Sequence, residues 1–298
     1  MTDSEYQLTL VDRVAVIKAA YEKFDLEKNG YISFSGGKDS TVLSYLFDMA
    51  VPGNKIPRIF INTGIEYNDI ISFVRKMISK DSRFMEVAPS SPIVNVLKKY
   101  GYPFKSKEHS KILYLYQMGS KCKTVAEYST GDSKFSCPKI LRYQFNPGFK
   151  IPVSDQCCIR LKKRPAHEYE KASVRKVAIL GLRLGEGGQR RNHPGCKVLD
   201  EDGNLVKFKP LNPVSEEWEE EFIKRNRIQL CRLYYPPFNF KRTGCKGCPF
   251  ALELQDELDV MGNFLGSERK QCEAVWKPIY DEYRRLGYRL RKEVKSND

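Results

Sequence analysis

Apolar positions along the chain alternate between short continuous runs and longer stretches with helical spacing. The continuous runs, bounded by polar residues, predict buried strands at 31–34, 58–61, 83–87 and 176–180. The stretches with a three- to four-residue apolar repeat predict helices at 4–27, 42–46, 70–77 and 93–100. Because strands that alternate with helices form parallel sheets, the pattern predicts an α/β fold with a doubly wound parallel sheet.

The rest of the chain divides into an irregular insertion and a C-terminal part. Residues 101–152 are rich in lysine, and we expect them to form helical excursions. Alternation around Asp202-Gly203-Asn204 predicts a hairpin over 197–209, and apolar spacing predicts helices at 216–225 and 267–287. We therefore predict two domains: residues 1–195 with a helical insertion around 101–155, and a smaller lobe, 196–298, with the hairpin, a Cys-x-x-Cys segment and the terminal helix.

A glycine-rich turn joins the first predicted strand to the helix that follows it. Its sequence is Ser35-Gly36-Gly37-Lys38-Asp39-Ser40. Such a turn directs backbone N–H groups and the positive end of a helix dipole at one point, where a phosphate binds well. The alternative is an ordinary strand-to-helix turn that carries a lysine. The predicted nucleotide-binding segment comprises Ser33, Phe34, Ser35, Gly36, Gly37, Lys38, Asp39 and Ser40.

The motif S-G-G-x-D-S in this turn resembles the PP-loop of the ATP pyrophosphatase and PAPS reductase superfamily. The resemblance implies a HUP-like, Rossmann-type fold that holds an adenine nucleotide, either ATP or an adenylyl sulfonucleotide. In members that adenylate a substrate, ATP is cleaved between its α and β phosphates. Lys38 would then stabilise the pyrophosphate leaving group, and Asp39 would help to hold Mg²⁺.

Two further loops follow predicted strands and resemble segments of the same family. Asn62-Thr63-Gly64 resembles its D-T-G segment, with Asn62 in place of the acid, and is predicted to bind nucleotide. The loop from Gly181 resembles the segment G-x-R-x-x-E-S-x-x-R, with glycine in place of the serine. Arg183 and Arg190 are suited to binding phosphate or sulfate, although a surface loop with solvated arginines is the alternative. The predicted catalytic residues are Lys38, Asp39, Arg183 and Arg190, and Gly181 and Arg183 are also predicted to contact the nucleotide.

Four of the nine cysteines occur in two pairs. They are Cys157-Cys158 and, 86 residues further on, Cys245-Lys246-Gly247-Cys248. Adjacent cysteines suit a cluster better than a single zinc ion, because neighbouring side chains diverge. The pattern resembles that of adenylylsulfate reductases, which implies a four-iron four-sulfur cluster. A zinc site and buried free thiols are the alternatives. The remaining cysteines lack a ligand spacing and are expected to be buried thiols: Cys122, Cys137, Cys196, Cys231 and Cys272.

Charge and hydropathy limit the possible partners and the compartment. The chain has 51 lysines and arginines against 37 acids, a net charge of +14 that suits polyanions such as nucleotides, tRNA or DNA. It contains no apolar run of 18 residues, and its first residues are polar. We therefore expect a cytoplasmic protein with no membrane span.

The sequence favours an ATP-using reaction over a reductive one. The C-terminal Glu-Cys-Gly-hydrophobic-His motif of sulfonucleotide reductases is not found in it, whereas Lys38 and Asp39 are both present. We expect adenylation coupled to sulfur transfer onto a nucleic-acid or small-molecule acceptor, which needs a sulfur donor. Reduction of a sulfonucleotide with a thioredoxin-like partner is one alternative. A non-catalytic regulator that binds nucleotide and senses a cluster is the other.

Overall fold

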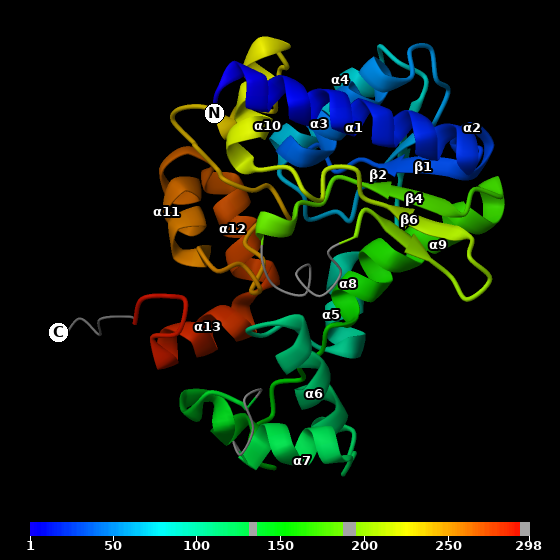
Figure 1. The fold of residues 1–298 in the computed structure, drawn as a ribbon. Coiled ribbons are helices and arrows are strands. Elements are labelled where there is room, and N and C mark those ends of the chain that lie inside the picture. The colour runs from blue at the N-terminus through cyan, green and yellow to red at the C-terminus, as the bar shows by residue number, and fades with distance from the viewer. Residues whose placement is uncertain (131–135, 187–194, 293–298) are drawn as a thin grey trace. The chain divides into compact units, whose positions relative to one another are not determined.

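The computed structural model describes residues 1–130, 136–186 and 195–292 (Figure 1). Its Cα positions group into two compact units. The first unit comprises residues 1–62, 66–88 and 165–243, and the second comprises 63–65, 89–164 and 244–298. Each unit is described by itself below. No helix of the described ranges has the length and apolar character needed to cross a membrane.

The first unit contains a six-stranded sheet in the order β3-β2-β1-β4-β6-β5. Its neighbouring strands are parallel, except that β5 runs antiparallel to β6. The strands are β1 (Gly30–Ser33), β2 (Arg58–Ile61), β3 (Phe84–Val87), β4 (Val177–Leu180), β5 (Lys197–Leu199) and β6 (Leu205–Phe208). The predicted α/β class, with a mostly parallel sheet, is confirmed.

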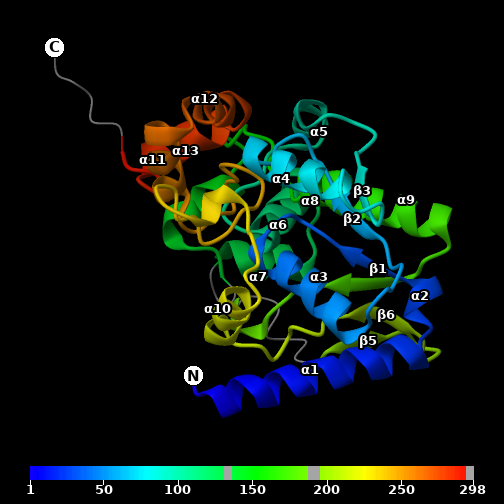
Figure 2. The same cartoon turned by 90° about the horizontal axis from the view of Figure 1, so that it is seen from above.

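Helices cover both faces of this sheet. Figures 1 and 2 show α1 beside α3 on one face, and Figure 1 shows α9 on the other. The apolar core under α1 and α3 includes Ile17, Phe47, Ile179 and Phe208, all fully buried. The helical segments of this unit are α1 (Asp3–Lys23), α2 (Leu26–Asn29), α3 (Lys38–Ala50), α4 (Asn68–Ile78), α9 (Arg164–Ser173), η3 (Leu184–Glu186), α10 (Glu216–Arg225) and η5 (Arg232–Tyr234).

Helix α10 is fixed to the first unit by an aromatic stack. The Trp218 ring lies between those of Tyr6 and Phe222, with centroid separations of 5.6 and 5.0 Å. Its indole N–H donates to the Tyr6 carbonyl oxygen at 3.1 Å, and the Ser215 hydroxyl caps the helix by accepting from the Trp218 amide at 3.1 Å. This packing determines where the acidic first turn of α10 lies.

The second unit is helical in its described residues. Its segments are α5 (Ile93–Tyr100), α6 (Lys107–Gln117), α7 (Lys123–Thr130), η1 (Lys139–Phe145), α8 (Gln156–Cys158), η2 (Ile159–Lys163), α11 (Leu254–Phe264), α12 (Gly266–Val275) and α13 (Lys277–Leu286). The single helix predicted over 267–287 is interrupted at Trp276. Pro278, in the first turn of α13, has no N–H to donate to the preceding helix, and it disfavours helical geometry at Lys277.

The two units divide the chain differently from the boundary predicted after residue 195. Residues 196–243 belong to the first unit, because β6 pairs with β4 and α10 packs on α3. The second unit joins the predicted helical insertion to the segment that carries Cys245 and Cys248. Both cysteine pairs therefore lie in one unit, and the glycine-rich turn lies in the other.

Candidate functional site

The glycine-rich turn connects β1 to α3 and is closed by its own hydroxyl groups. The Ser35 and Ser40 hydroxyls lie 3.0 Å apart, and Ser40 donates to the Gly37 carbonyl oxygen at 3.0 Å. Gly37 is the N-cap of α3, and Gly36 has a positive φ of 72°, which favours glycine. The turn thus places the first amides of a 13-residue helix, which is the geometry that phosphate sites use, and binding of a phosphate there stays a prediction.

A tyrosine from a distant part of the chain engages the first amide of this helix. The Lys38 N–H donates to the Tyr234 hydroxyl at 3.0 Å, and that hydroxyl lies 2.7 Å from the Thr243 hydroxyl. Burial raises the pKa of Tyr234 to about 12, so the phenol stays neutral at physiological pH. A phosphate that binds the Lys38 amide must therefore displace the Tyr234 hydroxyl from this N–H or share the N–H with it.

Five charged side chains form a closed network at the N-terminus of α3. The Lys38 ammonium lies 3.2 Å from Glu216 and 3.5 Å from Glu219. The Arg183 guanidinium lies 2.6 Å from Asp39 and 3.3 Å from the same Glu219. The structure thus brings together three of the predicted catalytic residues and adds two acids from α10.

Glu219 is the acid at the centre of this network, and its side chain is fully buried. Neither carboxylate oxygen accepts a hydrogen bond from the residues that the structure describes, although both cations are within 3.5 Å. Burial, followed by the charge of Asp39, raises the pKa of Glu219 to about 7, against the opposing effect of Arg183 and Lys38. By contrast, the hydrogen bond from Lys38 lowers the pKa of the more exposed Glu216.

The raised pKa of Glu219 predicts a pH-dependent contribution to stability. Its folded-state pKa lies above the ordinary value of 4.5, so the contribution is fully present below about pH 4.5 and is lost as pH rises through about 7. Glu219→Gln should remove this dependence, which we expect to be on the order of 1–3 kcal/mol. Urea unfolding at pH 5 and pH 8 measures it.

The matched control for that measurement is Glu220→Gln, an exposed acid on the same helix. It should leave the difference in free energy of unfolding between pH 5 and pH 8 as in the wild type. If Glu219→Gln also leaves it unchanged, the buried carboxylate does not titrate as the geometry requires.

Gly181 allows the end of β4 to approach the glycine-rich turn. A Cβ at this position would lie 2.8 Å from the carbonyl oxygen of Asp39 and 3.1 Å from the amide of Ser40, both of them backbone atoms. Neither backbone atom can move without displacing the first turn of α3. The predicted role of Gly181 near the nucleotide thus has a structural basis, although contact with the nucleotide stays a prediction.

We expect Gly181→Ala to weaken both the fold and nucleotide binding. Overpacking of this kind costs about 1–3 kcal/mol, and here the displaced atoms belong to the predicted phosphate-binding turn. The control is Gly185→Ala, since a Cβ at Gly185 meets no atom of the described ranges within 4 Å. Thermal unfolding and ATP titration of both variants provide the test. Equal unfolding temperatures and equal ATP affinities of the two variants would show that the close approach at Gly181 affects neither stability nor binding.

The other predicted nucleotide-binding residues occupy varied positions. Ser33 ends β1, and the following Phe34 is buried with its ring edge-to-face against Phe84. The Asn62 amide donates to Glu86 at 2.8 Å, so this side chain is engaged with an acid. Thr63 and Gly64 belong to the second unit, and Arg190 lies outside the described residues.

The four paired cysteines all lie in the second unit and interact with one another. The Cys157 pKa is raised by a hydrogen bond with Cys158, by burial and by the charges of Cys158, Cys248 and Cys245. Within the ranges that the structure describes, no three His, Cys, Asp or Glu side chains are close enough together to hold a metal ion. The thiol donors suit iron or zinc chemically, so the predicted metal role rests on donor type and stays a prediction.

The loop that carries Cys245 and Cys248 is fixed by aromatic side chains of the C-terminal helices. The Trp276 indole donates to the Lys246 carbonyl oxygen at 3.1 Å, and the Tyr283 hydroxyl donates to that of Pro249 at 2.9 Å. The Tyr280 hydroxyl donates to the Gly247 carbonyl oxygen. The Cys-x-x-Cys segment is therefore held in a defined backbone conformation, as a ligand loop requires.

Comparison with known families identifies the chain. The family described as phosphoadenosine phosphosulfate reductase domain matches residues 29–251, about three quarters of the chain. The protein belongs to this family, which is part of the PP-loop superfamily and binds adenine nucleotides. The predicted resemblance is confirmed.

Individual relatives are more distant. An uncharacterized protein of Methanocaldococcus jannaschii is 37% identical over 94 residues, which is 31% of this chain and 22% of that protein. The chain thus matches less than a quarter of that relative's length.

Three solved structures are similar at 15% identity. The PAPS reductase of Candida auris in a phosphate complex has a TM-score of 0.45 and covers 82% of this chain and 96% of its own. The FMN adenylyltransferase of Candida glabrata has a TM-score of 0.43, with coverages of 78% and 59%. The U34-tRNA thiolase NcsA of Methanococcus maripaludis with its 4Fe–4S cluster has a TM-score of 0.38, with coverages of 95% and 81%. These values are too low to transfer an activity to this chain.

Sequence reasoning missed four residues of the charge and hydroxyl network: Glu216, Glu219, Tyr234 and Thr243. Nothing in their spacing pointed to Lys38, since the nearest of them is 178 positions away. The acidic start of α10 was visible, but it indicated only a helix N-terminus.

Proposed function

We propose that this protein is an enzyme that binds ATP, cleaves it between the α and β phosphates, and couples the adenylation to sulfur transfer. The observation that carries the proposal is the placement of Lys38 and Arg183 beside Asp39 at the N-terminus of α3. Cations at a helix N-terminus stabilise the negative charge that develops on a pyrophosphate leaving group.

The proposed chemistry has two steps. An acceptor oxygen attacks the α-phosphorus, the bond between the α and β phosphates breaks, and pyrophosphate leaves. A sulfide donor then attacks the activated carbon or phosphorus of the acceptor, and AMP departs with the original oxygen. The new bond to sulfur replaces a bond to oxygen, so neither step changes the net oxidation state.

The charge network suggests how the site exchanges partners when nucleotide binds. Lys38 and Arg183 now pair with acids, and a triphosphate would compete for both cations. Release of Arg183 would free Asp39 to hold Mg²⁺ together with phosphate oxygens, the ligand set that this ion prefers.

The four paired cysteines would hold an iron–sulfur cluster. Cys157 and Cys158 from the insertion and Cys245 and Cys248 from the C-terminal segment supply four thiol donors within one unit. Thiolate sulfur is the usual ligand of such clusters. Zinc is the alternative occupant.

The acceptor is a nucleic acid or a small molecule. The net charge of +14 favours a polyanion, so tRNA or DNA is the macromolecular acceptor that we propose. A sulfur donor, or a thioredoxin-like protein that regenerates one, would complete the reaction. We propose the cytoplasm as the compartment of the reaction.

Reduction of a sulfonucleotide is the second candidate, and the reductase family to which the chain belongs favours it. In that reaction a thiol attacks the sulfur of adenylylsulfate, the bond from sulfur to the AMP phosphate oxygen breaks, and AMP leaves. The dithiol of a thioredoxin-like partner then reduces the resulting S-sulfonate, which releases sulfite, regenerates the thiol and oxidises the dithiol to a disulfide. A third outcome is a regulator that binds nucleotide without turnover.

One set of product assays separates these functions. Pyrophosphate release from ATP that requires added RNA or DNA supports the adenylating enzyme. Sulfite release from adenylylsulfate with reduced thioredoxin overturns it in favour of the reductase. Tight nucleotide binding with neither product identifies a regulator.

A further inference from the structure

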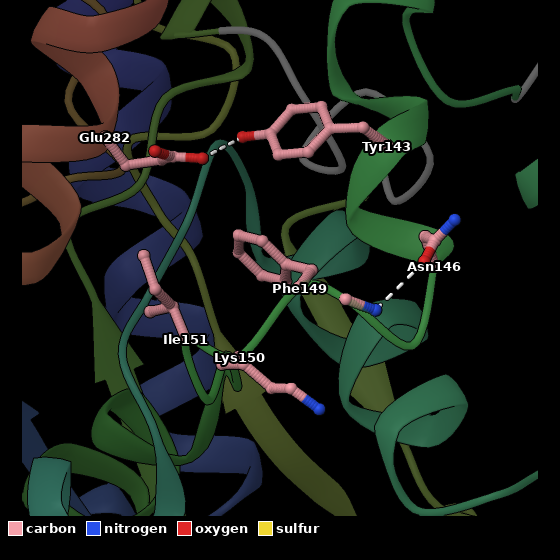
Figure 3. Close-up of a pocket in the computed structure, with 7 residues that line it drawn as sticks. Tyr143, Asn146, Phe149, Lys150, Ile151 and Glu282 are labelled. Atoms are coloured by element: carbon pink, nitrogen blue, oxygen red, sulfur yellow. Dashed lines mark hydrogen bonds between the residues drawn. The ribbon is translucent and has the colours of Figure 1, made fainter.

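A surface pocket in the second unit has the chemistry of a nucleobase site. Its volume is about 380 Å³, within the range of small-molecule sites. Aromatic and aliphatic side chains line it together with polar groups: Tyr143, Asn146, Phe149, Lys150, Ile151 and Glu282. Figure 3 shows the Phe149 ring at the centre of this group, with the Lys150 ammonium extending away from it.

The pocket is built on fixed backbone. The Gly148 amide donates to the Asn146 side chain at 2.9 Å, and the Phe149 amide donates to the Asn146 carbonyl oxygen at 3.0 Å. On the other side, the Gln117 amide donates to the carbonyl oxygen of Ile151 at 2.8 Å. A ligand that enters would meet a preformed surface, which lowers the entropic cost of binding.

The aromatic rings offer a stacking surface. Tyr143 and Phe149 form an edge-to-face pair, with centroids 5.7 Å apart and planes at 85°. Such a pair uses at most one of the four ring faces, and the Arg285 guanidinium lies over the Tyr143 ring at 5.1 Å. Phe149 is only half-buried, so its ring is the accessible platform.

The one acidic side chain among the lining residues, Glu282, has its charge balanced by a neighbour. Both carboxylate oxygens of Glu282 accept from Arg285, at 2.7 and 2.9 Å, and one also accepts from the Tyr143 hydroxyl. Its charge is thereby compensated within the pocket wall. Lys150 remains as an exposed cation of the pocket lining.

The surrounding chain is the most basic part of the protein. Residues 89–164, which supply all but one of the lining residues, contain 15 lysines and arginines against four acids. The rest of the second unit, residues 244–298, contains ten of each. The positive net charge is therefore concentrated in the segment that forms the pocket.

We propose that this pocket binds an unpaired base of a single-stranded nucleic acid by stacking on Phe149, while Lys150 and the basic segment contact the phosphates. An aromatic platform beside cations is the usual chemistry of single-strand recognition. A duplex does not fit, because its bases are stacked and paired. This inference rests on the proposed function, because it assumes that the acceptor is a nucleic acid.

Binding measured without ATP tests this inference separately from catalysis. We would titrate the whole protein into labelled single-stranded RNA, DNA of the same sequence, and the corresponding duplex, and follow fluorescence anisotropy. Phe149→Ala should weaken single-strand binding about 5- to 100-fold, and Phe149→Trp should retain it. Lys150→Gln should reduce the slope of log affinity against log salt by about 0.7, which Phe149→Ala should not change.

The control is Leu252→Ala, an exposed apolar residue of the same unit, which should bind as the wild type does. Single-strand binding that Phe149→Ala weakens supports the proposal, whether the strand is RNA, DNA or both, and a preference for one of them identifies the strand. Wild-type affinity of Phe149→Ala, equal binding of duplex, or no binding at all overturns it. Should RNA bind while no pyrophosphate is released, the proposed function fails and this site stands.

Discussion

Replacing Lys38 by alanine is expected to lower the rate of ATP-dependent pyrophosphate release by a factor of about 10²–10³ or more, while the fold is kept. Loss of one preorganised group that stabilises developing charge has this magnitude in other enzymes. Lys38 is placed for the role, because it begins α3 and lies beside the turn that is expected to hold the phosphates. Turnover kinetics and circular dichroism of the purified variant measure the two effects.

The structural contribution of Lys38 needs its own control. Its ammonium pairs with the buried Glu219, so removal of the charge also affects a compensated acid. Lys38→Met keeps the length of the side chain and should lose turnover to the same extent. Lys28→Ala removes an exposed lysine that pairs with Asp25 and should change neither turnover nor stability. Full activity of Lys38→Met would refute the catalytic role, and a collapsed fold in both Lys38 variants would make the residue structural.

Replacing Cys245 by serine is expected to abolish the visible absorbance of protein prepared without oxygen. A cluster held by four thiolates loses an anionic ligand in this variant, and serine is a poor substitute for it. Cys248→Ser should have the same effect. Iron and sulfide analysis, together with the absorption spectrum, measures the loss.

The matched control is Cys122→Ser. The prediction of a buried thiol at Cys122 is wrong, since this cysteine is exposed, and it lies in the same unit with no predicted ligand role. Its spectrum and iron content should equal those of the wild type. A colourless wild-type protein that contains zinc would show that the cluster assignment is wrong and would favour the zinc alternative.

Much of the sheet could be predicted from the sequence, because inner strands such as β2 and β4 are largely continuous apolar runs and the β5–β6 hairpin alternates around its turn. The predicted strand at 58–61 coincides with β2, and the predicted helix at 216–225 coincides with α10. Local patterns of this kind depend on burial of contiguous residues, which is visible in the chain itself. The turn at 35–40 was predictable for the same reason, since its glycines, lysine and serines are consecutive.

The surroundings of Lys38 could not be predicted in this way. Glu219 reaches Lys38 because Trp218 stacks between Tyr6 and Phe222, and this packing joins α10 to α1, which is far from it in sequence. The Tyr234 hydroxyl that accepts from the Lys38 amide depends likewise on tertiary packing. No periodicity or spacing encodes such contacts, so the acids that balance the two cations become visible only in the fold.

A crystal structure with α,β-methylene-ATP, which resists cleavage at the proposed bond, tests the central claim most directly. The account predicts phosphate oxygens at the amides of the first turn of α3, within hydrogen-bonding distance of Lys38. The Tyr234 hydroxyl should then have left the Lys38 amide or share its N–H with the phosphate. Phosphates bound elsewhere, with the 35–40 turn vacant and Lys38 still paired to Glu216 and Glu219, would contradict it.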